Sequence, residues 1–164
     1  VEWDATAKTT GSVRLGHVEK DAKESHGNDV DPTSGREDFD TPIWESSITW
    51  QPLSYSGFTL DYERSPTEAT TGRGFIDRVD TKLTWRHEWS SYLSSKVFAR
   101  RYSDDYVTTS RSDDTASIGA GLEYTLNHWV DLSADYLYED KNSTFDNNDY
   151  NGSVMIFGVK FAMD

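Results

Sequence analysis

The chain has 164 residues, no cysteine and a formal net charge of -13. This length suits one domain, the missing cysteines exclude a disulfide framework and a thiolate metal site, and the acidic balance argues against a nucleic-acid partner. Hydrophobic residues make up only 35% of the chain, and mean hydropathy is -0.75. No stretch approaches the roughly 18 apolar residues of a membrane-spanning helix. Membrane-spanning strands remain compatible with this composition, because only alternate residues of such a strand face lipid.

Along most of the chain every second residue is apolar and the residues between are polar or charged. In the segment 129–140, for example, Leu132 and Tyr136 alternate with Asp131 and Asp135. A period of two predicts strands with one apolar and one polar face. Taken in chain order, the predicted strands are eight in number: 4–18, 42–51, 57–64, 76–89, 92–103, 115–126, 129–140 and 152–162.

The predicted connections alternate in length. The short turns are 52–56, 90–91 and 127–128, and the long loops are 19–41, 65–75, 104–114 and 141–151. Short turns on one side and long loops on the other are typical of an outer-membrane meander. The sequence therefore predicts an all-β fold, a transmembrane antiparallel up-and-down β-barrel of eight strands, as a single domain over 1–164. An even strand count would place both termini in the periplasm and the long acidic loops outside a bacterial outer membrane.

Aromatic residues gather at the ends of the apolar stripes. Such residues form belts where acyl chains meet headgroups, and the predicted membrane-interface aromatics are Trp44, Trp50, Phe58, Tyr62, Trp89, Trp129, Tyr136, Tyr138 and Phe161. The competing interpretation is the core of a soluble β-sandwich. A sandwich core gives no reason to sort aromatics toward strand ends, so the membrane interpretation is favoured.

The polar stripes carry both signs of charge. The predicted lumen charge network is Arg14, Glu45, Asp61, Arg78, Asp80, Lys82, Arg86, Lys96, Arg100, Glu123, Asp131, Asp135, Glu139 and Lys160. Enclosed charges must be paired or hydrated, so we expect ion pairs across the interior. Eight strands alone would leave an interior filled by side chains, whereas in a larger barrel the same charges would line a polar conduit. The sequence leaves both alternatives open.

Several segments resemble outer-membrane β-barrel porins encoded beside exopolysaccharide biosynthesis genes. They are 49–52 (TWQP), 58–64 (FTLDYER), 80–87 (DTKLTWRH), 111–115 (RSDDT), 121–124 (GLEY) and 136–140 (YLYED). The resemblance spans about residues 42–162 and implies a role in moving polymer across the outer membrane. It carries no catalytic motif. Family members are usually longer, so the chain could also correspond to the C-terminal part of a larger barrel.

No catalytic, cofactor-binding or metal-binding residues are predicted. A lipid-A-modifying barrel enzyme would need an activated serine beside a histidine, and no such pairing or nucleophile elbow is present. The expectation is a non-enzymatic protein of transport or export type. Its expected partners are outer-membrane lipid, lipopolysaccharide and polysaccharide export machinery. Three alternatives remain: a closed structural or adhesive barrel acting through acidic loops, the lipid-A enzyme, and a soluble carbohydrate-binding sandwich.

Overall fold

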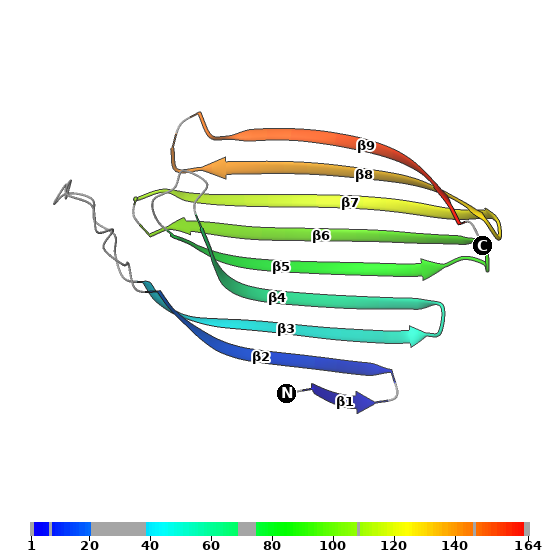
Figure 1. Ribbon diagram of the computed structural model, residues 1–164, viewed down its shortest axis with the longest axis horizontal. Helices are drawn as coiled ribbons and strands as arrows, with labels where there is room; N and C mark the ends of the chain where they lie inside the picture. The colour runs from blue at the N-terminus through cyan, green and yellow to red at the C-terminus, as the bar shows by residue number, and fades with distance from the viewer. Residues whose placement is uncertain are drawn as a thin grey trace.

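The computed structural model describes residues 2–6, 8–20, 39–68, 75–107, 109–145 and 147–162, and these residues form one nine-stranded sheet. Each strand pairs antiparallel with its neighbours in sequence, so the predicted all-β, up-and-down arrangement is confirmed (Figure 1). Within these ranges no helix is long and apolar enough to span a membrane. The strands are β1 (Glu2–Thr6), β2 (Thr9–Lys20), β3 (Phe39–Leu53), β4 (Ser56–Glu68), β5 (Phe75–Glu88), β6 (Leu93–Tyr106), β7 (Ser112–Asn127), β8 (Val130–Ser143) and β9 (Tyr150–Phe161).

All eight predicted strands are present, and the first of them is divided. The segment 4–18 turns back on itself between Thr6 and Thr9, which gives β1 and β2. The turn is held against the β3–β4 turn, because the Gln51 N–H donates to the carbonyl oxygen of Lys8 and the Lys8 ammonium donates to that of Pro52, both at 2.7 Å. No glycine or proline marks this turn in the sequence, so the alternation of apolar and polar residues predicted one continuous strand.

Because the first predicted strand is divided, an even strand count no longer places both termini at the short-turn end. With nine strands, β1 and β9 run in the same direction. The end of β9 does lie there, since the Ala162 N–H donates to the Trp129 carbonyl oxygen at 3.0 Å.

Most strands extend further toward the long-loop end than the alternation indicated. Of the predicted loop 19–41, Glu19 and Lys20 belong to β2 and 39–41 to β3, while 21–38 lies outside the described residues. Similarly, β7 begins at Ser112 and β8 ends at Ser143. Turn-forming residue types obscured these ends in the sequence, and paired charges hold them in the sheet.

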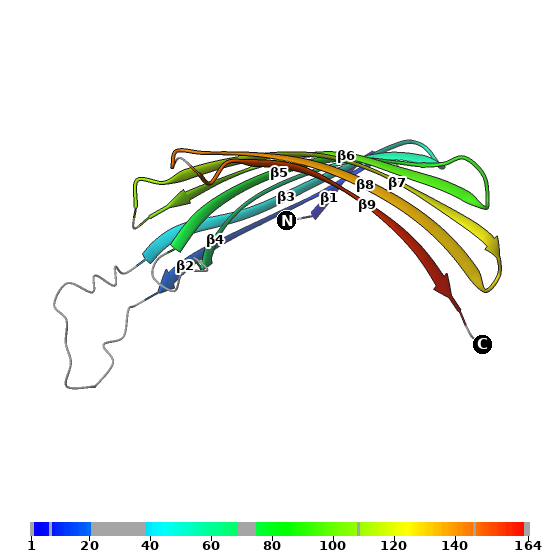
Figure 2. The ribbon, with the colours of Figure 1, turned by 90° about the horizontal axis from the view of Figure 1, so that it is seen from above.

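The sheet is a single curved layer (Figure 2). Among the described residues the buried hydrophobic side chains are only Ile76 and Val130, so a sandwich core with a second sheet is absent. The sheet is also open: β1 covers only Thr9–Ser12 of β2, and β9 pairs with β8 alone. The closed eight-stranded barrel predicted from the sequence is therefore not present within the described chain.

Small residues on one face of β7 leave space for side chains of the neighbouring strands. Thr115, Ser117, Gly119 and Gly121 are buried there, although they lie on the polar face. A Cβ atom added to Gly119 would lie 2.3 Å from Cε1 of Phe98 on β6. The missing side chain thus provides the space that the Phe98 ring occupies.

We expect Gly119→Ala to lower the free energy of unfolding by about 1–3 kcal/mol, the usual cost of overpacking. The matched control is Gly152→Ala on β9, where an added Cβ has no heavy atom within 4 Å. Urea unfolding of the refolded protein measures both. Equal stability of the two variants would contradict the packing of Phe98 over β7.

Candidate functional site

The pairing register places all fourteen residues of the predicted charge network on one face of the sheet, which we call the polar face. Directly paired residues of neighbouring strands share a face. One row, for example, runs from Asp61 to Lys82 and Arg100, and continues through Ser117 to Glu139. The sequence alternation was therefore sufficient to group residues that lie on eight strands, from β2 to β9.

The predicted aromatics lie on the opposite face, which we call the apolar face, or in the turns at its end. Trp50 stacks on Phe58 with ring centroids 5.6 Å apart, and Trp129 stacks on Phe161 at 6.3 Å. The aliphatic side chains between the aromatics are unusually open for a folded protein, since Leu15 is 81% exposed and Phe157 is 74% exposed. An exposed apolar surface of this extent marks an interaction with lipid or with another protein.

Ion pairs organise the polar face in the half nearest the long loops. Arg78 donates from Nε and Nη2 to the Asp104 carboxylate at 2.6 and 2.7 Å, and Arg100 on β6 pairs in the opposite sense with Asp80 on β5. The ring of Tyr102 lies 4.6 Å from the Arg78 guanidinium and 4.9 Å from that of Arg100. These contacts combine charge-assisted hydrogen bonds with cation–π attraction.

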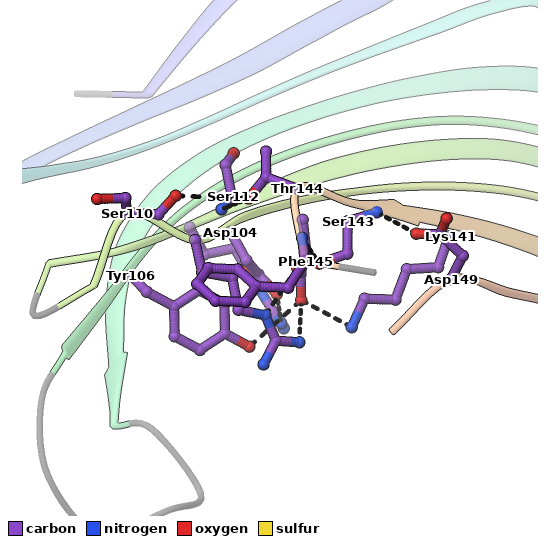
Figure 3. Close-up of polar contacts among 12 residues, drawn as sticks. Asp104, Tyr106, Ser110, Ser112, Lys141, Ser143, Thr144, Phe145 and Asp149 are labelled. Carbon is purple, nitrogen blue, oxygen red and sulfur yellow. Dashed lines mark hydrogen bonds and ion pairs between the residues drawn. The ribbon is translucent and has the colours of Figure 1, made fainter. Parts of the chain in front are cut away.

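The most enclosed charge is Asp113, whose side chain is fully buried at the long-loop end of β7. Its carboxylate accepts hydrogen bonds from Arg111 at 2.5 and 2.9 Å, from Ser143 at 2.6 Å and from Tyr106 at 3.4 Å, and it pairs with Lys141 at 2.8 Å. Figure 3 shows Tyr106, Lys141 and Ser143 converging from β6 and β8. We call these five residues the Asp113 cluster.

The hydrogen bonds from Arg111 to Asp113 also raise the pKa of this loop arginine above its ordinary value. The sequence analysis missed the Asp113 cluster because it assigned 104–114 and 141–151 to loops. The available signal was the alternation itself, which continues from Ser117 and Thr115 back to Asp113. The cluster joins three strands and the β6–β7 loop, so its effect is to hold the long-loop end in one arrangement.

The observed ion pairs of the polar face lie within the sheet. Arg14–Glu45, Arg78–Asp104, Arg100–Asp80 and Lys141–Asp113 each join neighbouring strands. No pair among the described residues crosses an interior. Because the sheet is open and has no opposite wall, pairing across an interior stays a prediction.

Charges nearer the short turns are arranged differently. Asp61 accepts a hydrogen bond from Ser47 and Asp131 accepts one from Thr125, while Lys82 lies 5.0 Å from the ring centroid of Phe98. Arg86, Lys96, Asp135, Glu123 and Lys160 form no ion pair with a described residue. The ion pairs of the polar face thus lie in the Asp61–Lys82–Arg100 row or beyond it toward the long loops, whereas Arg86, Lys96 and Asp135 lie on its short-turn side.

Nothing in the described part of the chain gathers three potential metal ligands. His87 lies on the apolar face, with its ring centroid 4.3 Å from that of Trp89 and 5.5 Å from that of Trp85. It therefore belongs to an aromatic group at the short-turn end of the sheet.

A curved, antiparallel, single-layer sheet with an aromatic-bounded apolar face and an ion-paired polar face defines the wall of a membrane-type β-barrel. The chain belongs to the family described as "Putative beta-barrel porin 2", whose model matches residues 1–163. The predicted porin family is therefore confirmed. No curated protein and no solved structure matched the chain.

We expect Asp113→Ala to cost about 3 kcal/mol of unfolding free energy, because it leaves Arg111 and Lys141 without their shared buried counter-charge. The matched control is the adjacent Asp114→Ala. Asp114 pairs with Arg101 on the apolar face, where the two side chains are 48% and 73% exposed, and loss of such a surface pair costs about 0–1 kcal/mol. Denaturant titration of both variants tests this, and similar losses for both would contradict the role of the Asp113 cluster.

Proposed function

We propose that this chain forms part of a pore wall in the bacterial outer membrane and serves the passage of exopolysaccharide or a related polar solute, without catalysis. The observation that carries the proposal is the division of the sheet into an apolar and a polar face. In a barrel the apolar face meets lipid and the polar face meets an aqueous lumen. Ion pairs between neighbouring strands, such as Arg78–Asp104, would neutralise charges of the wall without side chains that reach across the lumen.

The apolar side chains between the aromatic residues of the apolar face form a band, which we call the apolar band. Its position across the strands supports a tilted, membrane-spanning sheet. The row of paired residues that starts at Trp50 on β3 passes through Phe58 and Trp85 and ends at Met155 on β9. The aromatic residue at the short-turn boundary of the apolar band is Trp50 on β3 and Phe161 on β9. Phe161 lies six residues beyond Met155, which is in the row of Trp50, and β9 is six strands from β3. The band therefore shifts by one residue per strand.

This shift has the size that barrel geometry requires. With about 3.3 Å per residue and about 4.8 Å between strands, one residue per strand corresponds to a tilt of about 35°. Barrel strands tilt by about 35–45°. A band that crosses the rows of hydrogen bonds at this angle becomes horizontal when the strands are tilted in a bilayer.

We further propose that the nine strands are one arc of a wider barrel. The exposed edges of β2 and β9 carry backbone groups that find no hydrogen-bond partner in hydrocarbon, so each edge must pair with a strand in a membrane. Ion pairs within the wall fit a wide lumen better than an eight-stranded interior filled by side chains. The long acidic loops would face outward toward lipopolysaccharide, the short turns would face the periplasm, and polysaccharide export machinery would be the periplasmic partner.

We expect Leu122→Arg to impair membrane insertion, because Leu122 lies within the apolar band, where an arginine costs about 2–4 kcal/mol near the bilayer midplane. The adjacent Glu123→Arg places the same side chain on the polar face and should be tolerated. Heat-modifiable gel mobility after refolding into lipid vesicles reports insertion. Equal insertion of the two variants would show that the faces are assigned wrongly.

We expect the 164-residue chain, reconstituted as a monomer, to conduct ions poorly, because its sheet is open at both edges. Conduction should appear only with self-association or with additional strands. Single-channel recording in planar bilayers, paired with crosslinking of the same sample, separates these states. Large stable conductance from a crosslink-negative monomer would overturn the wider-barrel proposal.

A further inference from the structure

The polar face has a half-open hollow of about 470 Å³ in its short-turn half. Its volume is within the roughly 300–1,000 Å³ of small-molecule sites. The floor includes Gly121 on β7 and Gly158 on β9. The charged side chains that line the hollow are three cations, Arg86, Lys96 and Lys160, and four carboxylates, Glu88, Glu123, Asp131 and Asp135. An added Cβ at Gly121 would lie 2.4 Å from Oδ1 of Asp135 and 3.8 Å from Cε of Lys96, so this glycine lets both side chains approach over one strand.

Two of the three cations that line the hollow lie side by side. Arg86 on β5 and Lys96 on β6 are directly paired across the sheet, an arrangement that is destabilising for like charges. Neither side chain forms an ion pair with a described residue. Arg78, eight residues from Arg86 on β5, and Arg100, four residues from Lys96 on β6, each do. The arrangement is suited to an anionic group that contacts Arg86 and Lys96 together.

Acceptors for hydroxyl groups lie on the next two strands. Asp135 on β8 follows in the same row as Arg86 and Lys96, with only Gly121 between Lys96 and Asp135. Glu123 on β7 lines the adjacent row. Both carboxylates are without an ion pair in the described part of the chain. A simple inorganic anion would satisfy the cations and leave these carboxylates unused.

We propose that the hollow binds one acidic sugar unit, with the sugar carboxylate on Arg86 and Lys96 and its hydroxyl groups donating to Asp135 and Glu123. The inference rests on the proposed passage of polysaccharide and specifies the class of polymer as uronate-bearing. Charge-assisted hydrogen bonds to a carboxylate would supply most of the affinity, and the hydroxyl contacts would distinguish a sugar acid from sulfate.

The test is calorimetric titration of the full chain, refolded in detergent, with trigalacturonate, maltotriose and sodium sulfate at low ionic strength. We expect trigalacturonate to bind at least about tenfold more tightly than maltotriose or sulfate, the size of one charge-assisted hydrogen bond. The double variant R86Q/K96Q should lose this preference. Arg14→Gln, which removes a polar-face cation outside the hollow, should retain it, and Arg86→Lys should recover part of it.

Each other result overturns the proposal in a specific way. Equal binding of trigalacturonate and maltotriose excludes an acidic ligand, and equal binding of sulfate excludes a sugar. Unchanged affinity in R86Q/K96Q, with folding verified by gel mobility, places the site elsewhere. Binding in detergent does not depend on conduction, so the two proposals can fail separately. Specific binding of trigalacturonate by a chain that never forms a pore would contradict the proposed function alone. Conduction without such binding would contradict this inference alone.

Discussion

Backbone pairing between neighbouring strands sets the register on which every other property of this sheet depends. Because side chains alternate with a period of two, a slip of one residue would exchange the two faces of a strand. In β5 such a slip would move Arg78, Lys82 and Arg86 to the apolar face and place Leu83 and Trp85 among charges. The cross-strand pair of Arg78 with Asp104 and the stack of Phe58 with Trp85 each require the observed register. Polar and aromatic contacts therefore reinforce the same hydrogen-bond ladder from opposite sides.

Charge is distributed unevenly along the polar face, and this has a functional consequence. At the long-loop end, Asp113 and Asp104 are buried and fully engaged by cations, so these residues stiffen the wall and have little capacity left for a ligand. Toward the short turns, Arg86 and Lys96 are adjacent and form no ion pair with a described residue, although Asp135 lies in the same row. A translocating polymer would meet rigid, neutralised walls at one end and available donors and acceptors at the other.

The unpaired edges of the sheet are the places where further strands would bind. An exposed strand edge invites pairing, and β9 has apolar side chains on both faces, including Val154 and Ile156 on the polar face beside Met155 and Phe157 on the apolar one. A strand of this composition is suited to being covered on both faces as well as paired at its edge. The same feature that makes an isolated chain prone to association would fit it into a larger wall.

The sequence by itself determined the strands, their two faces and the family, because alternation, aromatic placement and loop length are local properties of the chain. It did not determine the turn between Thr6 and Thr9, which depends on hydrogen bonds from β3 and its turn, or the Asp113 cluster, whose members come from segments rich in turn-forming residues. Which charges pair was also decided only by the tertiary structure. Arg78 and Arg86 look equivalent in the alternation of β5, yet Arg78 has a carboxylate opposite it and Arg86 has a lysine. Cross-strand register joins residues far apart in sequence, and no local pattern encodes that choice.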